Sequence, residues 1–331
     1  MSFDLNRFLV VAEIGINHEG NFEQAKKILK LAAESGADCV KFQSYTPARY
    51  ASANDPARLQ RVTKMALSAE QFKELADMAR GLGVTFFSTP LTEDWVDILN
   101  DFCPLFKIAS GDITFEPVIR KAAATGKPVI ISTGTATLEE IDRAVNWVKD
   151  EIGTRDLKDH LVLMHCVSAY PAPIEEANVL SVPFLKERYG IRVGYSNHVM
   201  GMNASLAAVA LGADVVEIHF TDQKDGREFR DHSLSFEKAD MQAFIAAAAE
   251  IRKSLGVYGK QPMPCETAII PAVRKGVVAA RDLKAGQVLT ANDLMYARPA
   301  TEFPSGEITS LIGKSINEDI AQGHLVPRKA I

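Results

Sequence analysis

The sequence predicts an α/β protein in which a (β/α)8 TIM barrel is followed by a small β-rich domain. Eight short apolar segments of strand type alternate with eight segments of helical periodicity over residues 8–255. Strict alternation over this length is typical of a closed ring of parallel strands with helices outside. The pattern changes after Gly256, where a segment with several prolines precedes short β-rich stretches.

The predicted strands are apolar runs that turn polar at their carboxyl ends, as parallel strands buried on both faces do. They cover residues 8–17, 38–43, 84–89, 106–110, 128–134, 161–166, 192–198 and 215–220. The helical patterns cover residues 22–35, 68–82, 93–100, 116–125, 138–149, 179–189, 202–211 and 236–255. Capping boxes begin two of these helices, at Ser68 with Gln71 and at Thr137 with Glu140. The polar residues 44–64 predict a long loop of a size that is often functional or mobile.

A doubly wound open sheet is the alternative architecture. No G-x-G-x-x-G follows the first strand, which weakens a dinucleotide-binding interpretation. The expected division is a barrel over residues 1–256, a linker over 257–272 and a second domain over 273–331. That domain is too small for much core of its own. Its β-rich stretches lie at residues 274–280, 282–289, where a tight turn occupies 282–286, and 325–327.

Composition limits the partners. The 331 residues are 47% apolar and carry a net charge of -5, so the chain lacks the basic surface that nucleic acid requires. The N-terminus has no long apolar region, and no apolar run reaches transmembrane length. We therefore expect a cytoplasmic protein with no membrane partner. The cysteines form no C-x-x-C pair and are expected to be reduced and buried, namely Cys39, Cys103, Cys166 and Cys265.

Two neighbouring strands end in histidine, at His198 and His219, with one helix between them. Such a β–α–β unit places both imidazoles at one edge of the sheet. Together with the Glu13 carboxylate, and with Glu217 as a further candidate, they suit Mn, Fe or Zn. The alternatives are that each histidine is structural and that Glu13 is a general base or a lysine partner.

A second group of strand-end residues predicts an oxyanion site. It combines two cations with small hydroxyls, from Lys41, Lys107, Ser110, Ser132 and Thr133. Lysines beside Ser-Gly and Ser-Thr-Gly turns suit a ligand with several oxygens, such as phosphate. The alternative is that the lysines pair in a structural ion network with nearby carboxylates, namely Glu13, Asp112 and Glu217.

Motifs along nearly the whole chain, in order, resemble one family. In the barrel they are AEIGINHEG from Ala12, VKFQ from Val40, FSTP from Phe87, FKIASG from Phe106, KPVIISTG from Lys127, His165–Cys166, GYSNH from Gly194 and EIHFTD from Glu217. This set is similar to the sialic acid synthases, the nonulosonate synthases that make N-acetylneuraminic, legionaminic or pseudaminic acid. The tail resembles their antifreeze-like SAF domain, a β-clip fold, through VVAARDLKAG from Val277, YARP from Tyr296 and IGK from Ile312.

The resemblance implies a C–C bond-forming transferase. It would condense phosphoenolpyruvate with the open-chain aldehyde of an N-acylated hexose, with water attack and C–O cleavage releasing phosphate. An N-acetylneuraminate synthase, or a close relative such as a legionaminate or pseudaminate synthase, fits this description. Three alternatives stay open: a phosphoenolpyruvate-condensing aldolase acting on a phosphorylated aldose, a spore-coat or surface-polysaccharide synthase of the same family, and a non-enzymatic carbohydrate- or ice-binding protein.

The resemblance also implies roles for individual residues. The catalytic residues would be Glu13, His198 and His219. The two histidines would hold a divalent metal, Mn2+ in the first place, with Mg2+ or Co2+ as alternatives. Phosphoenolpyruvate would contact Lys41, Gln43, Thr89, Lys107, Ser110 and Ser132. The sugar would contact Asp112, Tyr170, Asp231 and Arg298, the last from a partner subunit, because the family forms dimers with exchanged C-terminal domains.

The departures from the usual family pattern fall on the sugar side. They include Asp112, Ser168, Asn197 and the run Phe229–Arg230–Asp231, where sialic acid members usually carry other residues. The resemblance therefore implies the reaction type more directly than it implies the acceptor sugar.

Overall fold

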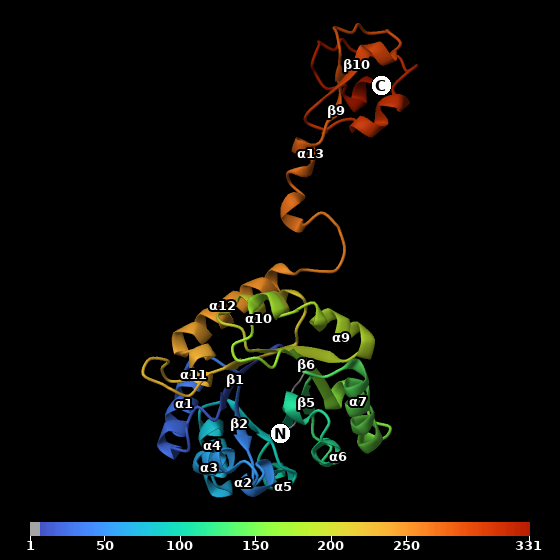
Figure 1. The fold of residues 1–331 in the computed structure, drawn as a ribbon. Coiled ribbons are helices and arrows are strands. Elements are labelled where there is room, and N and C mark those ends of the chain that lie inside the picture. Colours follow the sequence, from blue (N-terminus) through green and yellow to red (C-terminus); the bar gives the residue numbers. More distant parts are fainter. Residues whose placement is uncertain (1–6) are drawn as a thin grey trace. The chain divides into compact units, whose positions relative to one another are not determined.

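Eight parallel strands close into a barrel in the computed structural model, which describes residues 7–331 (Figure 1). They pair in chain order: β1 (Leu9–Gly15), β2 (Cys39–Ser44), β3 (Thr85–Pro90), β4 (Phe106–Ile108), β5 (Val129–Ser132), β6 (Leu161–Cys166), β7 (Arg192–Asn197) and β8 (Val215–His219). β8 pairs with β1, which closes the ring. The structure thus confirms the predicted (β/α)8 barrel over a doubly wound open sheet.

Helices surround the ring of strands, and their apolar faces pack against it to form the main core. They are α1 (Phe22–Glu34), α2 (Pro47–Tyr50), α3 (Pro56–Met65), α4 (Ala69–Gly81), α5 (Asp94–Asn100), α6 (Glu116–Ala124), α7 (Leu138–Ile152), α8 (Leu157–His160), α9 (Ser181–Tyr189), α10 (Asn203–Ala210), α11 (Asp231–Leu234) and α12 (Lys238–Ser254). Short 3-10 turns η1 (Ser110–Asp112) and η2 (Ile174–Glu176) follow β4 and β6. Both predicted capping boxes are present, at the start of α4 and of α7.

The prediction of a long loop over residues 44–64 is wrong, because α2 and α3 lie within it. Asp55 caps α3 by accepting a hydrogen bond from the Arg58 amide (3.0 Å), and Pro56 occupies the first turn, where its missing N–H has no consequence. Val62 of α3 packs with Tyr45 in a small separate apolar cluster. This cluster holds the segment above the carboxyl end of β2. The short helices α8 and α11 were not predicted either.

By its internal contacts the chain divides into two units, Met1–Gly256 and Val257–Ile331. In the second unit, β9 (Gly276–Ala279) pairs antiparallel with β10 (Leu294–Ala297). Short helical elements complete it: η3 (Pro264–Glu266), α13 (Ile270–Val273), η4 (Ala291–Asp293), η5 (Ser305–Ser310) and η6 (Arg328–Ala330).

The second unit has a core of its own, which the sequence argument did not anticipate. Buried apolar residues from several of its segments pack together, among them Val277, Leu289 and Leu311. The expected strand over residues 282–289 forms only isolated β-bridges. The strand β10 was not predicted. The core therefore rests on short bridged segments rather than on long strands.

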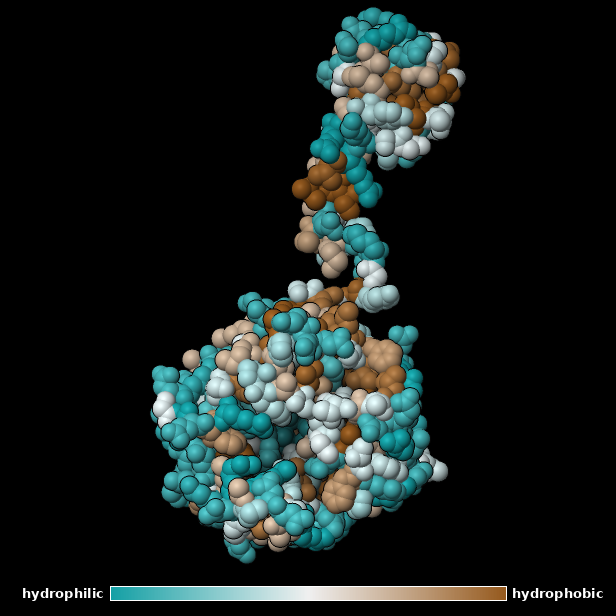
Figure 2. Space-filling model, viewed as in Figure 1, coloured by the Kyte–Doolittle hydropathy of each residue, from teal (hydrophilic) through white to brown (hydrophobic). Residues whose placement is uncertain are grey.

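Other sequence predictions have mixed outcomes. Cys39, Cys103 and Cys166 are free and buried as expected, but Cys265 is exposed. Residues 1–6, on which the interpretation of the N-terminus rests, lie outside the described part of the chain. Among residues 7–331, none of the helices combines the length and apolar character needed to cross a membrane. The visible surface is a mixture of hydrophilic and apolar patches, including apolar side chains around α13 (Figure 2).

Gly20 fixes the distance between the loop after β1 and α3. Its φ is +81°, and a Cβ there would lie 2.1 Å from the Lys64 carbonyl oxygen. Gly83 has a similar φ of +78° but open space around it, which makes it a matched control. We predict that Gly83→Ala lowers the free energy of unfolding by about 1 kcal/mol through the left-handed backbone alone. Gly20→Ala should cost about 1–3 kcal/mol more because α3 must move.

Urea unfolding followed by circular dichroism measures both changes in the free energy of unfolding. Equal losses in the two variants would show that the contact between Gly20 and α3 imposes no constraint.

Candidate active site

Strand register places three polar side chains of β8, β1 and β2 at one level of the barrel mouth. Glu13 lies opposite His219 on one side and opposite Lys41 on the other. All three are buried, with at most 6% of each residue exposed. Lys41 Nζ lies 2.7 Å from Glu13 Oε2 and 3.6 Å from Glu217 Oε1. Glu13 is therefore a lysine partner, which was one of its two alternative roles.

The ionisation of this group is set by burial and by mutual charge. Burial opposes the charge on Lys41, but Glu13 and Glu217 outweigh it and raise its pKa. Burial raises the pKa of Glu13, which Lys41 only partly offsets. Burial acts in the same direction on Glu217, but Lys107 and Lys41 outweigh it and lower its pKa. The result is a buried, mutually compensated set of carboxylates and ammonium groups.

Lys107 of β4 has a different environment from Lys41. Its Nζ donates to Ser132 Oγ (2.6 Å) and to the Ile108 carbonyl oxygen (3.0 Å). Burial lowers the pKa of Lys107, since its direct partners are neutral. Beside it, Ser110 Oγ accepts a hydrogen bond from the Gly134 amide (3.1 Å), and its hydroxyl also interacts with the Cys166 thiol.

The two strand-end histidines lie together, with their ring centroids 5.4 Å apart. The Tyr170 ring covers His198, at 4.0 Å between centroids. Nδ1 of His198 is 2.6 Å from the Val167 carbonyl oxygen and 3.5 Å from Cys166 Sγ. Burial disfavours the imidazolium, but the contact with Cys166 outweighs it and raises the pKa of His198. Because Nδ1 faces the carbonyl, Nε2 is the nitrogen left for a ligand.

The histidines fit one half of a metal site. A ligating histidine commonly donates its other N–H to a backbone carbonyl, as the His198 geometry allows. No hydrogen bond to the His219 ring is found within residues 7–331. Burial of the ring, and next the charge of His198, hold the pKa of His219 well below its usual value. A neutral ring is the form that binds metal. Across the same residues, no group of three His, Cys, Asp or Glu side chains is placed to hold an ion.

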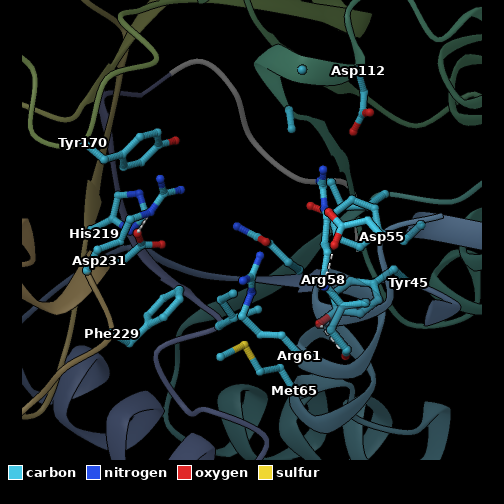
Figure 3. A pocket seen from close by; sticks show the side chains of 18 of the residues that line it. Tyr45, Asp55, Arg58, Arg61, Met65, Asp112, Tyr170, His219, Phe229 and Asp231 are labelled. Atoms are coloured by element: carbon cyan, nitrogen blue, oxygen red, sulfur yellow. Dashed lines mark hydrogen bonds and ion pairs between the residues drawn. The ribbon is translucent and has the colours of Figure 1, made fainter. Parts of the chain in front are cut away.

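Two cavities open at this end of the barrel. The inner cavity has a volume of about 210 Å3 and brings together twelve residues that the sequence singled out: Glu13, Lys41, Gln43, Thr89, Lys107, Ser110, Ser132, Ser168, Tyr170, His198, Glu217 and His219. The outer cavity, of about 880 Å3, includes Asp112 and Asp231 in its walls (Figure 3). Gln43, Tyr170 and His219 line both cavities, so the two adjoin.

Some of the residues that line the outer cavity were not predicted from the sequence. Tyr45, Tyr50, Arg58 and Arg61 come from the segment that was expected to be a loop. The signal was present: Asp55–Pro56 marks a helix start, and Arg58 and Arg61 are then three residues apart on one face. Arg298 lies in the second unit, so its expected contact with a partner's barrel stays a prediction.

Comparison with known proteins identifies the family. Residues 28–260 match the model of the NeuB family, and residues 274–329 match the SAF domain. The chain belongs to the NeuB family. This confirms the resemblance and shows that the chain is an enzyme of the sialic acid synthase type.

Similarity to individual NeuB-type proteins extends over most of the chain. The chain is 37% identical to N,N'-diacetyllegionaminic acid synthase of Campylobacter jejuni, over 97% of this chain and 99% of that protein. It is 32% identical to N-acetylneuraminate-9-phosphate synthase of Mus musculus, over 97% and 92% respectively. The crystal structure of N-acetylneuraminic acid synthetase from Leptospira borgpetersenii matches with a TM-score of 0.75 at 31% identity, over 80% of this chain and 91% of that one.

Asp112 provides a pH test of the outer cavity. Burial raises the pKa of Asp112 to about 6 from its ordinary value of 3.8, although Lys107 opposes the shift. Between these pH values the folded state binds more protons than the unfolded state, so ionisation of Asp112 costs stability as the pH rises. We predict that the stability of Asp112→Asn relative to wild type increases between pH 4 and pH 7, as measured by urea unfolding.

Below pH 3.8 the wild type and the variant should differ least. A stability difference that does not change with pH would show that the Asp112 carboxyl keeps its ordinary pKa.

Proposed function

We propose that this chain is a nonulosonate synthase that condenses phosphoenolpyruvate with the open-chain aldehyde of an N-acylated hexose. The observation that carries the proposal is the inner cavity, which combines two buried ammonium groups with a pair of adjoining imidazoles. The cations suit a small polyanion, and the imidazoles suit a metal that polarises a carbonyl.

Phosphoenolpyruvate would lie against the lysines. Lys107 has only neutral direct partners, and Ser132 and Ser110 place hydroxyls beside it. Lys41 reaches the same cavity and touches Thr89 Oγ1 at 3.2 Å. Charge-assisted hydrogen bonds from these groups would hold the phosphate and carboxylate oxygens.

The proposed reaction forms one C–C bond and breaks one C–O bond. Carbon 3 of phosphoenolpyruvate attacks the aldehyde carbon, whose oxygen takes a proton and becomes a hydroxyl. Water adds at carbon 2, and phosphate leaves with the bridging oxygen, which yields a 2-keto acid. In this proposal Glu13, whose pKa burial raises, would direct that water and accept its proton. A divalent metal on His198 and His219, Mn2+ in the first place, would supply Lewis-acid polarisation of the aldehyde.

The sugar would extend from the inner into the outer cavity. Tyr170 lines both cavities, whereas Asp112 and Asp231 line the outer one and can accept hydrogen bonds from hydroxyl groups. We further propose a homodimer in which Arg298 of one subunit completes the sugar site of the other. Exposed apolar side chains of the second unit and linker, among them Tyr258 and Ile269, support such an association.

The first test is release of inorganic phosphate from phosphoenolpyruvate. We predict release only when an N-acylated hexose and a divalent metal are both present. Candidate acceptors are N-acetylmannosamine, its 6-phosphate, and diacetamido-trideoxyhexoses. Treatment with a chelator should abolish release, and Mn2+ should restore it. Product mass would identify the sugar joined to the three-carbon unit; no release with any of these acceptors would count against the proposal.

The second test asks whether His219 binds the metal. We predict that His219→Ala lowers turnover by more than about 100-fold and weakens Mn2+ binding measured by titration calorimetry. His160→Ala is the matched control, because His160 is a half-buried histidine on α8 that lines neither cavity. Full Mn2+ affinity in His219→Ala would remove this residue from the metal site.

A further inference from the structure

The outer cavity has two walls of different chemistry. One wall comes from the barrel and α11, with Tyr170, His219 and Asp231. The other comes from α2 and α3, and it carries Arg58 and Arg61 (Figure 3). In Figure 3 the two arginine side chains lie across the cavity from Tyr170 and His219. A ligand that spans this cavity would therefore contact His219 at one end and the arginines at the other.

Arg58 and Arg61 are held by their helix, but their charges are not paired. They are three residues apart, so α3 presents them on one face. The Arg58 guanidinium lies over the Tyr50 ring, 5.4 Å from its centroid. No ion pair involves either guanidinium within residues 7–331. By contrast, Arg230 on the opposite wall is paired with Asp231, at 3.0 Å.

Phosphoenolpyruvate does not account for this second pair of cations. Neither Arg58 nor Arg61 lines the inner cavity, where Lys41 and Lys107 supply the positive charge. The arginines are thus left for the part of the acceptor that is farthest from its reacting aldehyde. Guanidinium groups present several N–H donors in a planar fork, which matches the oxygens of a phosphate group better than it matches a neutral hydroxyl.

We propose that Arg58 and Arg61 bind a phosphate monoester at the end of the acceptor sugar remote from the aldehyde. This inference rests on the proposed function, because it takes the aldehyde to lie at His198 and His219. The acceptor class is then an N-acylated hexose phosphate. The inner lysines hold the phosphate that leaves, and the outer arginines hold the phosphate that stays.

The experiment compares acceptors with and without the phosphate. N-acetylmannosamine and N-acetylglucosamine are each assayed free and as the 6-phosphate, with the wild type and with the double variant Arg58→Gln/Arg61→Gln. We expect the wild type to have the higher kcat/KM for a phosphorylated acceptor. The ratio of phosphorylated to free acceptor should fall by about 10–100-fold in the double variant, as expected for lost hydrogen bonds to a charged group.

Lys64→Gln is the matched control. Lys64 lies on α3 and carries the same charge, but it does not line the outer cavity. It should therefore keep the wild-type ratio. Thermal unfolding of each variant shows whether α3 stays folded, and the KM for phosphoenolpyruvate shows whether the inner cavity is intact.

The outcomes separate this inference from the proposed function. Turnover with an unchanged ratio in the double variant, or a wild type that prefers the free sugar, overturns the arginine site and leaves the synthase standing. Absence of turnover with every acceptor counts against the synthase. In that case the affinities of the wild type and the double variant for the two sugar phosphates, measured by calorimetry, test the arginine site. Equal affinity of the wild type and the double variant for these sugar phosphates would overturn it.

Discussion

The ion group of Lys41, Glu13 and Glu217 is the constraint on which the barrel mouth depends. Burying charges is costly unless they compensate one another, and removing one partner leaves an uncompensated charge inside the protein. The 2.7 Å contact between Lys41 and Glu13 exists only because β1 and β2 pair in a register that sets the two residues opposite each other. The same register on the other side of β1 brings His219 to that level. One strand register therefore sets both the charge compensation of Lys41 and the position of His219.

The two buried lysines play unequal parts in this arrangement. Lys41 already has carboxylate partners, so its charge is compensated in the absence of a substrate. Lys107 has a hydroxyl and a carbonyl as direct partners, and burial lowers its pKa. An arriving anion therefore gains more from Lys107 than from Lys41, because among residues 7–331 no carboxylate lies within ion-pair distance of Lys107, whereas two lie that close to Lys41. Because Lys107 is incompletely compensated, the inner cavity favours the binding of a polyanion.

Much of the inner site could be predicted from the sequence, for a physical reason. In a barrel the carboxyl ends of all strands lie at the same mouth, so a polar residue at a predicted strand end is predicted to line that mouth. His198 and His219 follow from that rule alone. Arg58 and Arg61 do not, because they lie on a helix whose position depends on the packing of Val62 with Tyr45. The β9–β10 pairing escaped prediction similarly, since bridges between short segments leave little periodicity.

The inner lysines and the outer arginines are constrained by the fold to different degrees. The inner cations are buried in strands whose register cannot shift without exposing or separating charges, so the site proposed for phosphoenolpyruvate is tightly constrained. The outer arginines stand on α3, a short helix inside the connection between β2 and α4. A connection of this kind can change its residues without disturbing the strands. Specificity for the acceptor is therefore expected to depend on this segment, while the chemistry depends on the strand ends.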